Sequence, residues 1–162
     1  MIKQNVQDIV NKQINAEMYS AYLYLGMAVW CTDQNLNGFA QWLKVQAKEE
    51  MGHAMRLYKY LEDTDSQIVL KAIDAPPAKW SSVLAIFEDA YKHEQKVTGM
   101  IYEIVNLANK EGDHATASMC KWFVDEQVEE ENQTLAIVNQ LKMAGDSKGG
   151  LMQIDHHVGK RE

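Results

Sequence analysis

Apolar positions recur with the 3.6-residue period of an α-helix in four long segments and a short fifth. These segments are residues 5–32, 37–63, 82–110, 114–144 and 149–159. Ser81 or Ser82 is a suitable N-cap for the third segment, and Asp113 is one for the fourth. No stretch shows the alternation of β-branched residues that predicts a strand. The pattern therefore predicts an all-α chain.

The lengths of the connections predict how these helices are arranged. Short breaks follow the first and third helices, so each is predicted to run antiparallel to the helix after it. The connection at 64–81 holds the only prolines, Pro76 and Pro77, and loses the helical period. Its roughly 17 residues reach about 55 Å when extended, whereas a helix of about 27 residues is roughly 40 Å long. We expect one domain over 1–162, a four-helix bundle with one long crossover and a short fifth C-terminal helix.

Polar side chains interrupt the apolar face of every long helix. Counting at intervals of four and three from Phe39 follows one face of the second helix through Leu43, Gln46, Glu50, His53, Leu57 and Tyr60. The same count places on the other three helices Glu17, Glu94, and Gln127 with Glu130. Unpaired buried carboxylates cost several kcal/mol each, and no Lys or Arg lies on these faces. Either a cation compensates them or they share protons.

The spacing of the polar residues repeats between the two halves of the chain. Glu17 and Glu50 are 33 positions apart, as are Glu94 and Gln127. An offset of 77 positions also relates Glu49 to Glu126 and His53 to Glu130. Two hairpins that present a repeated set of ligands predict a two-metal site, in which Glu50 and His53 at i and i+3 chelate one ion. Mixed carboxylate and imidazole ligands favour iron or manganese, and zinc stays open; we favour iron.

Composition narrows the class of protein. With 162 residues and 46% hydrophobic content, the chain can build one substantial core. A net charge of −7 argues against binding nucleic acid. The start of the sequence has no export signal, and the longest uncharged run, 18–32, is too short to span a membrane. Cys31 and Cys120 form no metal-binding motif and are expected to be buried free thiols. We expect a cytoplasmic protein with no membrane partner.

Four ligand-bearing segments, in order, resemble the bacterial non-haem ferritins. They are NAEMYSAYLYL around Glu17, AKEEMGHAMRLY around Glu50, YKHEQ around Glu94 and WFVDEQVEEE around Glu130. The resemblance covers nearly the whole chain and includes the crossover and the short last helix. It implies a ferroxidase and iron store: a homo-oligomeric shell of 24 copies that oxidises Fe(II) with O2 or H2O2 inside each bundle and stores the ferric mineral.

The resemblance also implies a role for each polar residue. The first iron would be bound by Glu17, Glu50 and His53, and the second by Glu50, Glu94 and Glu130. Gln127 would orient oxygen species, and Tyr24 would lie beside the dinuclear centre, either as a hydrogen-bond or electron donor or only as part of the core. A third, looser iron site would use Glu49, Glu126 and Glu129 together with Glu130. Trp122 is interpreted as a packing residue.

The first and last helices carry the expectation of assembly. The stretch MYSAYLYLGMAVW is apolar nearly all round, which predicts that its outer residues Tyr19, Tyr22, Leu23 and Met27 meet another subunit. The last helix is similar to the one that surrounds the fourfold axes of ferritin shells. Its His156 and His157 could line a pore or bind metal at such an axis, but they are interpreted as surface residues.

Other classes of protein are kept as alternatives. A haem-containing bacterioferritin would use Met51, although His rather than Glu is then expected at position 130. A different di-iron carboxylate oxidase also fits the ligand pattern. A rubrerythrin-like peroxidase would need CxxC pairs that the sequence lacks, and a non-catalytic interaction module leaves the buried carboxylates without a cause.

Overall fold

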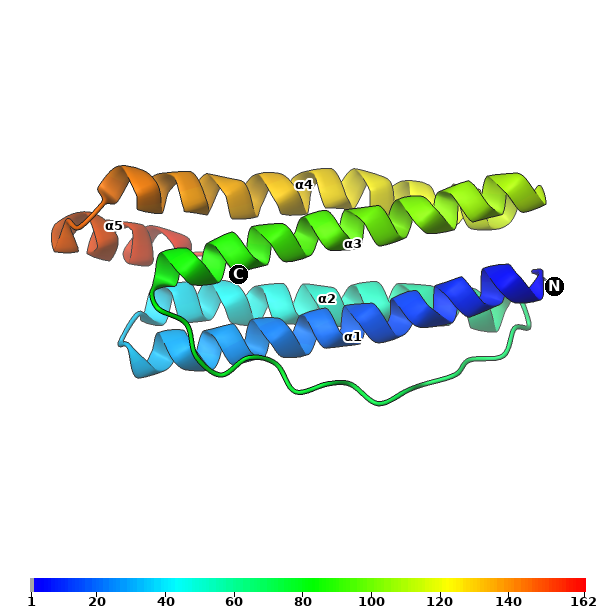
Figure 1. The fold of residues 1–162 in the computed structure, drawn as a ribbon, viewed down its shortest axis with the longest axis horizontal. Helices are drawn as coiled ribbons and strands as arrows, with labels where there is room; N and C mark the ends of the chain where they lie inside the picture. The colour runs from blue at the N-terminus through cyan, green and yellow to red at the C-terminus, as the bar shows by residue number, and fades with distance from the viewer. Residues whose placement is uncertain (1) are drawn as a thin grey trace.

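The structure, a computed structural model, describes residues 2–162, and every regular element in that range is an α-helix. The helices are α1 (Gln4–Asp33), α2 (Asn37–Asp63), α3 (Val83–Glu111), α4 (His114–Ala144) and α5 (Lys148–Val158) (Figure 1). The all-α prediction is confirmed, and each helix end lies within one residue of its predicted position. Met1, where the expected domain begins, lies outside the described residues.

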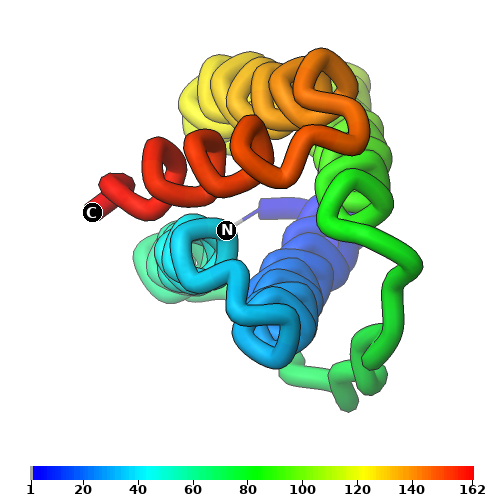
Figure 2. Tube along the Cα trace, turned by 90° about the vertical axis from the view of Figure 1, so that its left-hand side faces the viewer, coloured from blue at the N-terminus to red at the C-terminus, as the bar shows by residue number. Residues whose placement is uncertain are grey.

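The long helices form two antiparallel pairs, α1 with α2 and α3 with α4 (Figures 1 and 2). The segment from 64 to 82 runs along the outside of α1 and returns the chain to the end of the bundle where α2 begins (Figure 1). Helices α2 and α3 are therefore parallel, as the crossover predicted. Helix α5 packs against α2 and α4 at that same end.

Side-chain amides of α1 hold the crossover in place. Asn11 donates through Nδ2 to the carbonyl of Gln67 at 2.9 Å and accepts from the amide of Val69 at 2.7 Å. Gln7 and Asn15, one turn away on either side, make equivalent bonds to the same extended segment. An extended strap has no intrahelical partners for its backbone, so this ladder of amides supplies them.

The N-caps that the sequence indicates for α3 and α4 are formed. Ser82 accepts from the amide of Ala85 at 3.1 Å, and Asp113 accepts from that of Thr116 at 3.0 Å. At the start of α2, the N-cap residue Leu36 has no side-chain acceptor. Asp155 of α5 fills that role, since its Oδ1 accepts from the amide of Phe39 at 2.9 Å. The cap therefore also anchors α5 to α2.

Two apolar clusters fill the bundle, one on each side of a polar layer. The cluster nearer α5 is built around Phe39 and Phe87, and the other around Leu57 and Ile101. Along each long helix, the acidic residues predicted to bind metal lie between the segments that enter these clusters. Cys31 and Cys120 are buried free thiols, as expected. The polar layer is thus enclosed by apolar core on both sides.

The prediction that Leu23 and Met27 lie on the outside of α1 is wrong. Leu23 is 6% exposed and Met27 is fully buried within the chain. Helix α1 is covered on several sides at once: by α2, by α3, and by the crossover, whose prolines lie against Gly26 so closely that an added Cβ would be 3.0 Å from Pro76 Cγ. Tyr22, by contrast, is 48% exposed.

Two smaller observations complete the description of the surface. His156 and His157 are exposed, as interpreted from the sequence. Among residues 2–162, every helix falls short of the combination of length and hydropathy that a transmembrane helix requires.

Candidate metal centre

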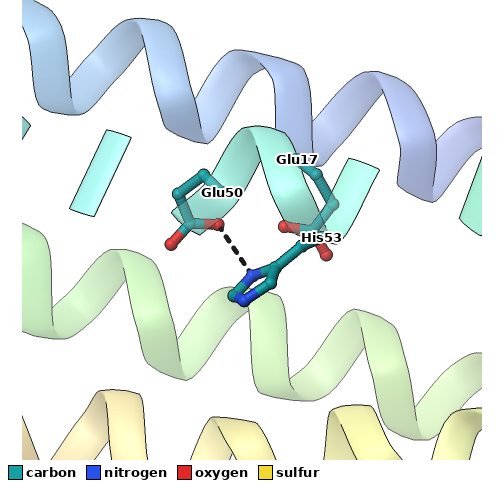
Figure 3. Close-up of side chains that lie close together, drawn as sticks. All are labelled: Glu17, Glu50 and His53. Carbon is teal, nitrogen blue, oxygen red and sulfur yellow. Dashed lines mark ion pairs between the residues drawn. The ribbon is translucent and has the colours of Figure 1, made fainter. Parts of the chain in front are cut away.

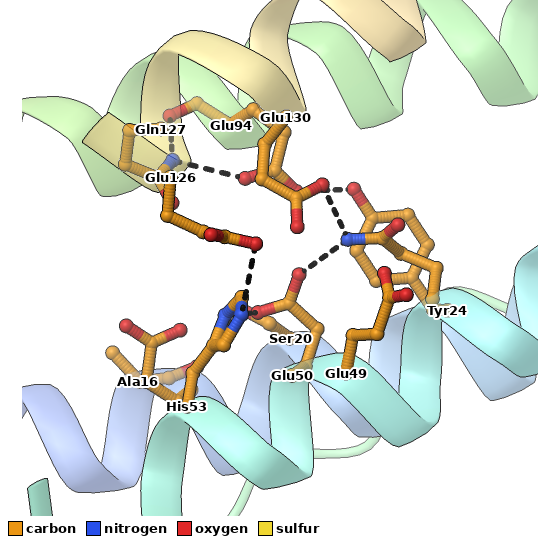
Figure 4. Close-up of polar contacts among 12 residues, drawn as sticks. Ala16, Ser20, Tyr24, Glu49, Glu50, His53, Glu94, Glu126, Gln127 and Glu130 are labelled. Atoms are coloured by element: carbon orange, nitrogen blue, oxygen red, sulfur yellow. Dashed lines mark hydrogen bonds and ion pairs between the residues drawn. The ribbon is translucent and has the colours of Figure 1, made fainter. Parts of the chain in front are cut away.

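Four carboxylates and one imidazole, drawn from all four long helices, converge between the two apolar clusters of the bundle (Figures 3 and 4). Each of these side chains is buried: Glu17, Glu50, His53, Glu94 and Glu130. Helical spacing causes the convergence, because each residue replaces an apolar one on the inward face of its helix. The residues predicted from the seams to be ligands are therefore brought together.

The five side chains form two overlapping ligand sets. Glu17, Glu50 and His53 offer ligand atoms that lie within 4.8 Å of one another (Figure 3). Glu50, Glu94 and Glu130 form a second set by the same measure. Glu50 belongs to both sets. A carboxylate has two oxygens, so one residue in this position can bridge two cations.

His53 is oriented by groups on both sides of its ring. Its Nδ1 lies 3.4 Å from Glu50 Oε2, and its Nε2 lies 3.8 Å from Glu126 Oε1 (Figure 4). The ring packs edge-on against Trp122 and Phe123, with centroids 5.5 and 6.1 Å away. Trp122 is thus a packing residue, as interpreted. A third set of possible ligands joins His53 and Glu126 to Glu130.

Burial raises the pKa of the clustered carboxyl groups. Desolvation is the main cause for Glu17, Glu50 and Glu94, and the pKa of Glu130 is raised to about 8 by burial and by the charge of Glu94. The charges of Glu94 and Glu130 raise the pKa of Glu50 further. With a pKa of about 8, Glu130 holds a proton near neutral pH, and a bound cation would favour the ionised form of all four carboxyl groups.

Two glutamines to which the sequence analysis gave no role donate hydrogen bonds to the ligand carboxylates. Gln13 donates to Glu17 Oε1 at 2.8 Å, and Gln46 donates to Glu50 Oε1 at 2.8 Å and to Glu130 Oε2 at 2.7 Å. A signal was available, since each Gln precedes a ligand by four residues and the two are 33 positions apart, as Glu17 and Glu50 are. The bond from Gln46 to Glu130 joins the two hairpins.

Tyr24 and Gln127 both donate to Glu94. The Tyr24 hydroxyl, fully buried, donates to Glu94 Oε1 (Figure 4). Gln127 donates through Nε2 to Glu94 Oε2 at 3.1 Å. Burial, followed by the charge of Glu94, raises the pKa of Tyr24, so its hydroxyl keeps its proton. Among the roles expected for Tyr24, the structure shows that of a hydrogen-bond donor to a ligand carboxylate.

One buried oxygen in the cluster lacks a hydrogen-bond partner. Within residues 2–162, Glu17 Oε2 is buried and neither donates nor accepts a hydrogen bond. Such an atom is costly unless a further group, such as a cation, interacts with it. This oxygen belongs to the ligand set of Glu17, Glu50 and His53. The hard oxygens and single imidazole of that set fit a first-row divalent ion.

The three outer carboxylates assigned by resemblance to a third iron each have a different partner. Glu126 faces His53, whereas Glu49 is paired with Arg161. Glu129 is exposed and accepts from Gln133 at 2.7 Å. Glu49 and Glu129 enter none of the three ligand sets found among the described residues. The third site stays a prediction.

Comparison with known proteins defines the class to which this bundle and centre belong. The sequence-family profile described as Ferritin, a ferritin-like domain, matches residues 7–144. The chain therefore belongs to the ferritin-like family. Membership supports iron storage, and the carboxylate cluster is compatible with a di-iron site.

Individual relatives narrow the likeness. A probable bacterial non-heme ferritin-like protein of Haemophilus influenzae is 38% identical over 159 residues, covering 98% of this chain and 96% of its own length. The bacterial non-heme ferritin of Staphylococcus saprophyticus is 38% identical over 161 residues, covering 99% and 96%. Among solved structures, an open-pore ferritin from the archaeon Archaeoglobus fulgidus has a TM-score of 0.99 and 42% identity, covering 99% of this chain and 98% of its own.

Proposed function

We propose that the protein is a ferroxidase and iron store that oxidises Fe(II) at a dinuclear centre within each chain and keeps the ferric product inside a shell of identical copies. The observation that carries this proposal is the position of Glu50 in two ligand sets at once. A storage protein without chemistry at this point would have no reason to bury four carboxylates beside one imidazole.

The substrate would bind in two adjacent positions. One Fe(II) would be held by Glu17, Glu50 and His53, and the other by Glu50, Glu94 and Glu130. Each Fe(II) gives one electron, so a pair reduces one O2, with two protons, to H2O2. When H2O2 is the oxidant, the same two electrons and two protons convert it to two molecules of water. Four carboxylates around the pair favour the more highly charged Fe(III) product.

The neighbouring residues would prepare the centre for this reaction. Gln46 holds Glu50 and Glu130 through hydrogen bonds, and Tyr24 and Gln127 hold Glu94. Ligands fixed by such outer partners lose less conformational freedom when a cation binds. Gln127 is placed near the second position, where we propose that it also orients the oxidant.

A third, weaker Fe(II) position beside the centre is part of the proposal. It would use Glu49, Glu126 and Glu129 with Glu130, as the resemblance implies. Loss of the three outer carboxylates together should leave the first two positions intact but lower the number of Fe(II) bound per chain. Equal binding in wild type and in the triple variant would make these groups an acidic surface only.

Assembly into a shell of 24 copies is supported by exposed apolar side chains on a single chain. On α1 and the crossover the most exposed are Tyr22, Leu25, Val29 and Leu70, between 45% and 62% exposed. Such a face favours contact with a further copy. We propose a cytoplasmic location, in keeping with the two free thiols.

The haem-containing alternative has one observation in its favour. Met51 follows Glu50 and is 42% exposed, so a sulfur ligand could face a second copy. Position 130 nevertheless holds Glu, and the relatives above carry non-heme names. An absorption spectrum of the purified protein without a Soret band is the expected result.

The test of the function combines kinetics with mass. Stopped-flow oxidation with two Fe(II) per chain should be fast in wild type and lost in Glu50→Ala and His53→Ala, while Glu62→Ala, an exposed change on the same helix, should match wild type. Sedimentation should find about 440 kDa, the mass of 24 chains of 18.5 kDa. Unchanged oxidation in both ligand variants would overturn the dinuclear assignment, and a stable monomer would overturn the shell.

A further inference from the structure

The segment that follows α5 lies against α2. Its course is set by close backbone packing: a Cβ on Gly159 would lie 2.7 Å from the Cα of Gly38, and Asp155 caps α2. The amide of Arg161 then donates to the carbonyl of Val158 at 3.2 Å. This geometry directs the Arg161 side chain along the face of α2 that leads to the ligands.

Arg161 contacts three residues on that face. Its guanidinium carbon lies 4.3 Å from the ring centroid of Trp42. One turn further along α2, Nη1 donates to Gln46 Oε1 at 2.8 Å. Beyond that, Nη2 donates to Glu49 Oε2. The Arg161 side chain is only 17% exposed and that of Glu49 is 40% exposed, so the ion pair is partly shielded from water.

The bond to Gln46 decides which end of its amide faces the ligands. An amide side chain can present either its oxygen or its NH2 group to a neighbour. A guanidinium only donates, so it requires the oxygen of Gln46 on its own side. The NH2 group is then directed to Glu50 and Glu130, where it makes both bonds described above.

The pair with Glu49 places a fixed positive charge on a carboxylate of the proposed third position. Arg161 binds Oε2 of Glu49, and a guanidinium and a metal cation cannot both occupy that oxygen. Resting on the proposed function, we infer that Arg161 is a positioning residue that competes with metal cations for Glu49. A cation that reaches Glu49 displaces the guanidinium, and the Gln46 amide then loses the donor that fixes its orientation.

Anaerobic titration of the assembled metal-free protein with Fe(II) tests this competition. Arg161→Met keeps an unbranched side chain over Trp42 but removes the charge and the donors. It should bind Fe(II) beyond the first two per chain roughly two- to fivefold more tightly, since a partly exposed ion pair contributes up to about 1 kcal/mol. Arg161→Lys keeps a charge without the planar fork and should lie between wild type and Arg161→Met.

Two further variants separate competition from a general effect of charge. Arg56→Met is the matched control, because the Arg56 guanidinium also lies over an indole, 4.2 Å from the Trp122 ring centroid, and makes no ion pair among the described residues. It should titrate as wild type does. In Glu49→Gln/Arg161→Met the gain in affinity should vanish, because the freed carboxylate is gone.

Three outcomes would overturn the inference. The first is that Arg161→Met binds the first two Fe(II) normally and binds later Fe(II) with the affinity of wild type. This result overturns the inference but leaves the dinuclear proposal intact. A gain that persists in the double variant also overturns it alone, because Glu49 is then not the group in competition. If wild type fails to bind the first two Fe(II) per chain, both the dinuclear proposal and this inference are wrong.

Discussion

The side-chain amide of Gln46 on α2 lies 2.7 Å from a carboxylate oxygen of Glu130 on α4, and this hydrogen bond joins the two hairpins at the metal centre. The same NH2 group donates to Glu50 at 2.8 Å. Each hairpin contributes one of these two carboxylates to the second ligand set. The distance between the hairpins at the centre is therefore set partly by an uncharged donor.

Replacing Gln46 by Leu should slow Fe(II) oxidation by about 10- to 100-fold, the usual cost of losing an outer-shell partner of a ligand. The physical reason is that Glu50 and Glu130 lose their common donor and with it their fixed separation. Stopped-flow absorbance measures the rate. Gln133→Leu is the control, since its amide also donates to a glutamate, the exposed Glu129, at 2.7 Å. Equal rates in the two variants would contradict the role assigned to Gln46.

The stability of the metal-free protein should fall as the pH rises from about 4.5 to about 8. Burial raises the pKa of Glu130 to about 8, so the folded chain keeps a proton that the unfolded chain releases near 4.5. A group whose pKa is higher in the folded state than in the unfolded state stabilises the fold fully below its unfolded pKa. This contribution is lost as the pH rises through its folded pKa. Burial also raises the pKa of Glu17, Glu50 and Glu94, so these groups change the stability in the same direction.

Urea denaturation of the metal-free protein at several pH values measures this dependence. Glu130→Gln should flatten the slope, because the replacement does not titrate. Glu103→Gln, an exposed change on α3, should leave the slope as in wild type. A free energy of unfolding that rises across this interval, or a slope that Glu130→Gln does not alter, would show that the carboxyl groups are ionised in the metal-free fold.

Tyr24→Phe should slow Fe(II) oxidation roughly tenfold or more while lowering the free energy of unfolding by only about 1 kcal/mol. The ring stays in the core, but Glu94 loses the hydroxyl that donates to it. Tyr60→Phe is the matched control, because its hydroxyl lies 2.8 Å from Thr116 Oγ1, outside the ligand sets. Should both variants oxidise Fe(II) as fast as wild type, Tyr24 would be a core residue only.

Gly38→Ala should destabilise the protein by more than about 2 kcal/mol and release α5 from the bundle. An added Cβ would lie 1.7 Å from the carbonyl oxygen of Asp155, which is backbone and cannot rotate away. Gly52→Ala on the same helix meets nothing within 4 Å and should stabilise by up to about 1 kcal/mol. Urea denaturation gives both values, and the sedimentation coefficient reports whether assembly needs a docked α5. Similar stabilities for the two variants would contradict the close packing of Gly38 on α5.

The helices and the depth of the polar layer can be predicted from the sequence alone. Both are local properties: a 3.6-residue period, caps at Ser82 and Asp113, and charged residues at inward positions of a seam. The cost of burying Glu17, Glu50 and Glu94 also follows from residue type and position alone, so the sequence predicts a cation site.

The partner that each side chain contacts depends on how the helices pack together. The crossover covers α1 and buries Leu23 and Met27, whereas an apolar helix surface alone also fits a contact with another subunit. Gln46 reaches Glu130 across 84 positions, and Arg161 reaches Glu49 across 112. These contacts depend on the relative register and rotation of packed helices. No local pattern specifies those quantities, because they result from how all the side chains of the core fit together at once.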